Sequence, residues 1–262
     1  MTEADPAPGG PIVRHHIDGG VATITLDDPA HRNALSFDMT RALAAAVEAV
    51  LADESVGAVV VTAAPPVFSS GGSLDDLLAP RATLEEIYRG FESIAEAPVP
   101  TVAAVGGPAI GAGVNVALAC DVIVCSPAAR FDPRFLDIGI HPGGGVLWRL
   151  RERIGRQATA ALVLCGESLD GEGAARSGLA WRCVPDDELL TTALALAHRT
   201  ADRPHALVAR TKATLDATTS APTTLDDAIA LELTAQRWSM TQADFHTRVD
   251  AIRTRVRAQR RS

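Results

Sequence analysis

Residues 100–126, PTVAAVGGPAIGAGVNVALACDVIVCS, constrain the fold more than any other stretch of the chain. The runs PTVAAVGG and CDVIVCS are almost entirely apolar instead of alternating with polar residues, which is typical of strands buried on both faces of a sheet. A glycine-spaced turn and an amphipathic run, AIGAGVNVALA, join them. The stretch therefore predicts a strand, a turn, a helix and a second buried strand in succession.

The same alternation of strands and helices extends over most of the chain. Residues 12–28 alternate between apolar and polar and break at Gly19 and Gly20, which predicts a β-hairpin. The further elements expected from periodicity are a helix at 35–54, a strand at 56–63 and a helix at 83–97. Because strands alternate with helices to about residue 185, the expected fold class is α/β.

The carboxyl-terminal part of the chain has a different character. From residue 186 onward, three helical segments follow one another without a strand between them, at 186–201, 204–217 and 223–256. Helices that cannot join the sheet must pack on the core or on a partner chain, and we expect oligomerisation. The expected domain plan is a disordered tail at 1–10, a core at 11–200 and a helical region at 201–262.

Composition and charge exclude several classes of protein. The chain of 262 residues has a formal net charge of −8, whereas binding to nucleic acid needs a basic face. No apolar run approaches the ~20 residues that span a bilayer, and the acidic, proline-rich start lacks the regions of a secretory signal. Four cysteines without CxxC spacing argue against a structural zinc site or a disulfide framework. We expect a cytoplasmic protein without a metal site.

The glycine turn at 111–113 has the composition of an anion-binding turn. A dinucleotide fingerprint requires glycine or alanine three residues after the second glycine, and Val116 stands there. A phosphate loop requires lysine followed by serine or threonine, which this turn lacks. The functional interpretation that remains is an oxyanion hole at a helix N-terminus, and a purely structural tight turn is the alternative.

A second glycine-rich turn occurs at 69–72. It follows an apolar run and precedes Ser73-x-x-Asp76, a pattern typical of a capping box at a helix start. Two helix starts can each aim one N–H group at a single carbonyl oxygen, which stabilises the enolate or tetrahedral oxyanion of a thioester. The presence of two such turns favours the oxyanion interpretation.

With these two turns in place, the chain resembles the crotonase superfamily, the enoyl-CoA hydratase/isomerase family, along nearly its whole length. The segments that carry the resemblance are VATITLDDPAHRNALSFDM, VVVTAAPPVFSSGGSL, PTVAAVGGPAIGAGVNVALACDVIVCSPAARF and IHPGGGVLWRLRERIGRQATAALVLCGESLDGEGAARSGLAWRCVP. The resemblance implies a crotonase-type spiral of ββα units with a C-terminal helical trimerisation region, assembled as a homotrimer or a dimer of trimers. It also implies an acyl-CoA substrate, with coenzyme A as part of the substrate and no other cofactor.

The resemblance further implies roles for individual residues. The oxyanion hole is expected at the backbone N–H groups of Gly72 and Ala112. Arg32 matches a basic position that often faces a CoA phosphate. The other residues expected along the substrate path are Ser70, Gly71, Ser73, Leu74 and Gly111.

Two positions depart from the family pattern. Family hydratases use two glutamates as acid and base for the added water, and the matching residues here are Asn115 and Phe135. An amide does not titrate near neutral pH, a phenyl ring has no proton to exchange, and each lost acid/base group lowers the rate by roughly 10²–10⁴. We therefore expect slow hydration, and isomerase, decarboxylase or thioester hydrolase chemistry in its place. The alternative hypothesis is a non-catalytic acyl-CoA-binding protein.

Substitutes for the missing glutamates are available in the sequence. Asp137 and His141 lie near Phe135 and form a possible acid/base pair, although ordinary polar residues of a turn are the competing interpretation. A further set of polar residues lies where family members vary most and either reaches a ligand or forms a solvated helix face, namely Asp75, Asp76, Glu85, Glu86 and Tyr88.

Overall fold

The computed structural model describes residues 10–79, 81–220, 224–245 and 247. The chain divides into two compact units, Met1–Ala201 and Asp202–Ser262, and each is described by itself. The tail expected at 1–10 lies outside the described residues except for Gly10, and so does most of the chain beyond Phe245.

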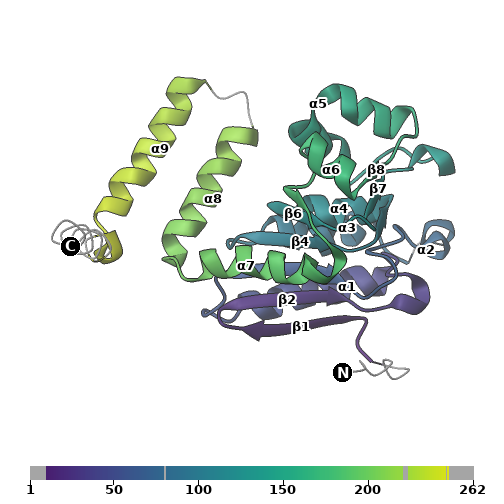
Figure 1. Cartoon of the computed structure of the whole chain (residues 1–262), viewed down its shortest axis with the longest axis horizontal. Coiled ribbons are helices and arrows are strands. Elements are labelled where there is room, and N and C mark those ends of the chain that lie inside the picture. Colours follow the sequence, from purple (N-terminus) through teal and green to yellow (C-terminus); the bar gives the residue numbers. More distant parts are fainter. Residues whose placement is uncertain (1–9, 80, 221–223, 246, 248–262) are drawn as a thin grey trace. The chain divides into compact units, whose positions relative to one another are not determined.

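The first unit is built on a six-stranded sheet (Figure 1). Its strands, in spatial order, are β1 (Val13–Asp18), β2 (Val21–Leu26), β3 (Ala58–Ala63), β4 (Thr101–Val105), β6 (Val122–Cys125) and β9 (Arg182–Cys183). The hairpin expected at 12–28 is confirmed, because β1 and β2 pair antiparallel, and all the other pairs are parallel. The two buried strands expected within 100–126 are β4 and β6, which are direct neighbours in the sheet.

A second sheet is small and has no clear periodic signal in the sequence. It consists of β5 (Pro108–Ile110), β7 (Arg130–Asp132) and β8 (Leu169–Asp170) in that order. Strand β5 pairs parallel with β7, which pairs antiparallel with β8. Because β5 directly precedes the glycine turn at 111–113, this small sheet fixes where that turn lies.

Helices cover both faces of the large sheet. Those of the first unit are α1 (Phe37–Leu51), α2 (Leu74–Leu78), α3 (Leu84–Ala95), α4 (Ala112–Ala119), α5 (Val146–Leu164), α6 (Gly171–Ser177) and α7 (Leu189–Ala201). Helix α1 confirms the helix expected at 35–54. It starts at Phe37 because the Ser36 hydroxyl accepts a hydrogen bond from the Met39 N–H and caps it.

Alternate residues along each strand point to opposite faces and build two apolar clusters. On one face, Ile24 and Val61 pack in a cluster that includes Leu43 of α1. On the other face, Val60 and Val102 belong to a cluster with Leu189, Ala193 and Ala197 of α7. A mostly parallel sheet covered on both faces is the α/β architecture expected from the sequence.

The second unit contains two helices in its described part, α8 (His205–Ser220) and α9 (Leu225–Met240). Helix α9 begins with a capping box between Thr224 and Asp227. The Arg210 guanidinium carbon lies 4.2 Å from the centre of the Trp238 ring, so a cation–π contact joins α8 to α9. Trimerisation through this unit stays a prediction.

Membrane spans and metal clusters were both expected to be absent. Within the described residues, no helix has the length and apolarity that crossing a membrane requires. The same residues contain no group of three or more histidine, cysteine, aspartate or glutamate side chains that could hold a metal ion.

Candidate active site

The two glycine-rich turns lie side by side although about 40 residues separate them in the sequence. The Ile110 N–H donates to the Ser69 carbonyl at 2.9 Å, and Ser69 forms a parallel β-bridge with Ala109. The N–H groups of Phe68 and Ser69 both donate to the Pro108 carbonyl, at 3.0 and 3.1 Å. These bonds bring the segments 68–72 and 108–113 into direct backbone contact.

The close approach of the turns explains why each contains glycine. Gly71 has φ of +94°, and a Cβ atom there would lie 2.6 Å from the Ile110 carbonyl oxygen and 3.5 Å from the Ala112 nitrogen. A Cβ atom on Gly113 would lie 2.7 Å from the Ser69 carbonyl oxygen. Any side chain at these two positions would wedge the turns apart.

The N–H groups of Gly72 and Ala112 are free to bind an acceptor. In the part of the chain that the structure describes, neither group donates a hydrogen bond. Ala112 is the first residue of α4, where backbone N–H groups have no acceptor within the helix, and α4 has no side-chain cap. Both residues are partly exposed, so a ligand oxygen can reach this positive end of the helix.

Asn33 anchors the first of these turns and was not among the residues expected from the sequence to have a role. Its side chain is fully buried, and its Nδ2 donates to the carbonyls of Ala64 and Val67 at 2.8 and 2.9 Å. Its own carbonyl accepts from the Ser69 hydroxyl at 2.8 Å. The only available signal was its residue type, because asparagine tolerates the positive φ, here +51°, better than most residues.

Backbone bonds place the predicted substrate-path residues around the same turn. The Leu35 N–H donates to the Gly71 carbonyl at 2.7 Å, and the Ser70 N–H donates to the Arg32 carbonyl at 3.0 Å. The Arg32 side chain is exposed. The Ser73 hydroxyl caps the short helix α2, whose first residue, Leu74, is 62% exposed. Gly111 lies in the second turn, and its N–H donates to the Asp132 carbonyl.

Asp76 has a structural role at the start of α1. Its carboxylate accepts the Phe37 N–H at 2.9 Å and binds Arg81 at 3.0 Å. The hydrogen bond from Arg81, followed by that from Phe37, holds the pKa of this carboxyl below its usual value. We therefore assign Asp76 to the cap of α1 and not to ligand binding.

Asn115 lies one helical turn beyond Ala112, on the same face of α4. Its side chain is buried, and Nδ2 donates to the Gly143 carbonyl at 3.1 Å. Its Oδ1 has no hydrogen-bond partner among the described residues. A Cβ atom on Gly144 would lie 2.9 Å from this Nδ2, so the turn at 143–144 packs directly on the amide.

The other predicted acid/base positions lie in the segment before that turn. Phe135 is partly buried and packs against the core as an apolar wall. Asp137 and His141 are exposed, and the His141 Nδ1 lies 2.8 Å from the Pro142 carbonyl oxygen. No hydrogen bond or ion pair joins Asp137 to His141 in the described structure. Their acid/base role stays a prediction.

Tyr88 of α3 also packs against the turn at 143–144. A Cβ atom on Gly143 would overlap the Tyr88 hydroxyl, so this hydroxyl packs directly on the turn. Burial raises the pKa of Tyr88, and the nearby carboxylates of Glu85 and Glu92 raise it further. The sequence placed Tyr88 only in a variable helix, because its contact with a turn 55 residues away leaves no local signal.

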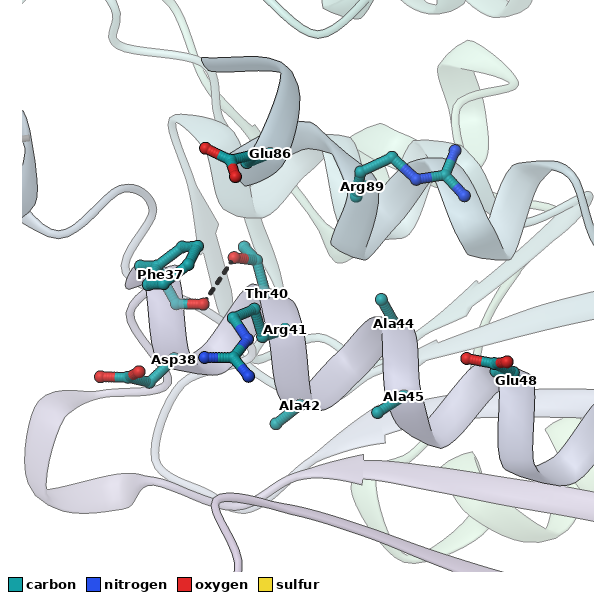
Figure 2. Close-up of a pocket in the computed structure, with 10 residues that line it drawn as sticks. All are labelled: Phe37, Asp38, Thr40, Arg41, Ala42, Ala44, Ala45, Glu48, Glu86 and Arg89. Carbon is teal, nitrogen blue, oxygen red and sulfur yellow. Dashed lines mark hydrogen bonds between the residues drawn. The ribbon is translucent and has the colours of Figure 1, made fainter. Parts of the chain in front are cut away.

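A surface hollow between α1 and α3 lies outside this site. It has a volume of about 700 Å³, and Figure 2 shows Glu86 and Arg89 of α3 above Arg41 and Glu48 of α1. The residues that line it include none from the turns at 69–72 and 111–113 and none from the turn at 143–144. The chemistry described above therefore rests on the geometry of the two turns and not on this hollow.

Comparison with known proteins agrees with this geometry. A family model described as enoyl-CoA hydratase/isomerase matches residues 16–255. "Probable enoyl-CoA hydratase EchA14" of Mycobacterium tuberculosis is 41% identical over 251 residues, which cover 91% of this chain and 96% of that protein. The 1,2-epoxyphenylacetyl-CoA isomerase of Escherichia coli is 30% identical over 251 residues and covers 92% and 95%.

Solved structures show the same fold. An enoyl-CoA hydratase from Mycobacterium smegmatis superposes with a TM-score of 0.86 at 29% identity, over 94% of this chain and 97% of that one. An enoyl-CoA hydratase from Polaromonas sp. JS666 gives 0.86 at 27% identity, over 93% and 97%. The resemblance expected from the sequence is confirmed, and this chain belongs to the enoyl-CoA hydratase/isomerase family of the crotonase superfamily.

Proposed function

We propose that the protein binds an acyl-CoA thioester and stabilises the enolate of its acyl group through the N–H groups of Gly72 and Ala112. One observation carries this proposal: two backbone N–H groups without acceptors lie on adjacent turns, one of them at the start of α4. Removal of one such donor from an oxyanion hole typically costs ~2.7–4 kcal/mol of transition-state stabilisation. Two donors held by rigid backbone therefore supply much of what enolate formation needs.

The proposed reaction class is isomerisation of the acyl group, and not addition of water. Asn115 and Phe135 occupy the positions of the hydratase glutamates and cannot activate water. An isomerisation moves a proton between carbons through the enolate and consumes no water. The Escherichia coli relative named as an isomerase supports this choice. Decarboxylation and thioester hydrolysis use the same oxyanion hole and are outcomes that the assay below separates.

The coenzyme A part of the substrate is assigned to the surroundings of the first turn. Ser70, Ser73 and Leu74 follow one another there, and the exposed Arg32 side chain is available to a phosphate group. No cofactor beyond coenzyme A is part of the proposal. The proposed assembly is a homotrimer or a dimer of trimers.

The test is a turnover assay on purified protein with saturated, 2-enoyl, 3-enoyl and malonyl-type CoA thioesters. Absorbance of the conjugated enoyl thioester reports isomerisation and hydration, free thiol reports hydrolysis, and mass spectrometry reports decarboxylation. We expect conversion of a 3-enoyl thioester and only slow hydration of a 2-enoyl thioester. Fast hydration would refute the inference from Asn115 and Phe135, and tight binding without any product would leave only acyl-CoA binding.

A matched pair of variants links turnover to the turns. Gly71→Ala introduces a Cβ atom 2.6 Å from the Ile110 carbonyl oxygen. Gly166→Ala introduces one at a similarly positive φ, +73°, with no atom within 4 Å. Both variants carry backbone strain, and only the first one disturbs the oxyanion turns. We expect Gly71→Ala to lose roughly 10²-fold or more in turnover, as the loss of one oxyanion donor does, and Gly166→Ala to retain it.

A further inference from the structure

The Tyr88 hydroxyl occupies a specific position on the turn at 143–144. A Cβ atom at residue 143 would lie 2.2 Å from the Tyr88 hydroxyl oxygen, so only glycine fits there. The Tyr88 ring lies 5.5 Å from the Phe91 ring, centre to centre, and Phe91 itself packs against Gly144. The hydroxyl is therefore held in place by packing.

The same short turn connects Tyr88 to the proposed oxyanion hole. Asn115, one helical turn beyond Ala112, donates to the Gly143 carbonyl. The buried Oδ1 of Asn115 has no hydrogen-bond partner among the described residues, so one polar atom here is unsatisfied. The Gly143 backbone thus contacts both the Asn115 amide, at a position that matches a family glutamate, and the Tyr88 hydroxyl.

The site needs a group that exchanges protons, and Asn115 and Phe135 cannot supply it. Tyr88 is the only tyrosine of the chain. We propose that Tyr88 is the proton-transfer group of the acyl site and replaces the family glutamates. This inference rests on the proposed function, because it assigns the base for the enolate that Gly72 and Ala112 stabilise.

The proposed step conserves atoms and electrons. The ionised Tyr88 oxygen takes a proton from the carbon next to the thioester carbonyl, so a C–H bond breaks and an O–H bond forms. The electron pair moves onto the carbonyl oxygen, where the N–H groups of Gly72 and Ala112 hold the charge. In the second half, the O–H bond breaks, the proton goes to another carbon of the conjugated enolate, and the tyrosinate is restored.

The electrostatic surroundings of Tyr88 give this mechanism a distinctive pH dependence. Burial and the carboxylates of Glu85 and Glu92 raise the pKa of the phenol, and the hydrogen bond with Gly144 lowers it in part. Arg149 of α5 donates to the Gly144 carbonyl at 3.2 Å, so its cation lies at the 143–144 turn. His141 lies two residues before this turn. Since the net shift is upward, only a small fraction of Tyr88 is ionised at pH 7. The rate should therefore rise about tenfold per pH unit up to the pKa of Tyr88.

The experiment follows deuterium from D₂O into the carbon next to the carbonyl of a saturated acyl-CoA, measured by mass spectrometry between pH 7 and 10. Tyr88→Phe keeps the ring packing and removes only the hydroxyl. We expect exchange to fall roughly 10²–10⁴-fold in this variant, as the loss of one acid/base group does, while the Kd of the same thioester stays within about threefold. Glu85→Gln, which removes one of the charges that raise the pKa of Tyr88, should shift the pH profile to lower pH.

Each outcome decides between the two proposals. Exchange in Tyr88→Phe at the wild-type rate, or a wild-type profile that is flat from pH 7 to 10, would overturn the role of Tyr88 and leave enolate formation standing. Absence of exchange in the wild-type protein at every pH would overturn the enolate proposal together with it. A loss of exchange accompanied by a large rise in Kd would assign Tyr88 to binding and also overturn the proton-transfer role.

Discussion

Replacing Asn115 by aspartate changes one atom of a buried side chain and should make stability strongly dependent on pH. The amide Nδ2 donates to the Gly143 carbonyl at 3.1 Å, and the residue is 1% exposed. A carboxylate in the same place would present an oxygen to that carbonyl. It would also place a negative charge on a side chain that is buried.

The size of the effect follows from the two losses. The missing hydrogen bond costs ~1 kcal/mol. A fully buried carboxyl has its pKa raised by roughly 3 units or more, and each unit corresponds to about 1.4 kcal/mol, so the charge adds about 4 kcal/mol once the group must ionise. Below the unfolded-state pKa of ~3.9 the introduced carboxyl is protonated in both states and can itself donate to Gly143. The loss of stability of Asn115→Asp should therefore be small near pH 4 and grow to ~5 kcal/mol by pH 8.

Urea unfolding followed by circular dichroism, at one protein concentration and at several pH values, measures this loss. Asn115→Leu is the matched control, because it removes the same hydrogen bond without adding a titrating group. The difference in the free energy of unfolding between Asn115→Asp and Asn115→Leu should widen as pH rises from 4 to 7 and then level off. A difference that does not depend on pH would mean that the site hydrates or pairs the carboxylate, and would refute the burial argument.

Two further outcomes are expected. Asn33→Asp should lower the free energy of unfolding by roughly 2–4 kcal/mol in urea titrations, because two carbonyls, of Ala64 and Val67, lose their donor; a loss below 1 kcal/mol would show that Asn33 does not anchor the turn. Alkylation of the native protein at pH 8, mapped by mass spectrometry, should modify the exposed Cys165 and spare Cys125, whose pKa is raised to about 12 by burial and by Cys183. Equal labelling of the two cysteines would contradict that placement of Cys125.

Much of the first unit follows from local pattern, and much of the candidate site does not. The hairpin at 12–28, helix α1 and the buried strands β4 and β6 have strong periodicity, so their existence was predictable and only their ends shifted by a few residues. The sequence allowed the two glycine turns to meet at one oxygen, because an apolar run precedes each of them. The contact of Tyr88 with the 143–144 turn joins distant segments and was not.

Other features that the sequence did not predict also have identifiable structural causes. The small sheet of β5, β7 and β8 has strands of only two or three residues, too short to show a period. Asn33 acts through hydrogen bonds with Ala64, Val67 and Ser69, which are 31 to 36 residues away in the sequence. The proposed pair of Asp137 and His141 was based on closeness in sequence, and the structure leaves both side chains exposed without a bond between them.

The groups that are proposed to hold the thioester oxygen are main-chain atoms, which no side-chain substitution can delete. The residues that are proposed to handle protons are side chains, and each can be exchanged by a single codon change. Proteins with such a scaffold can continue to bind acyl-CoA while substitutions change the reaction that they catalyse. Overall sequence identity to the named relatives therefore indicates a shared fold, whereas the few residues around the 143–144 turn indicate which reaction to expect.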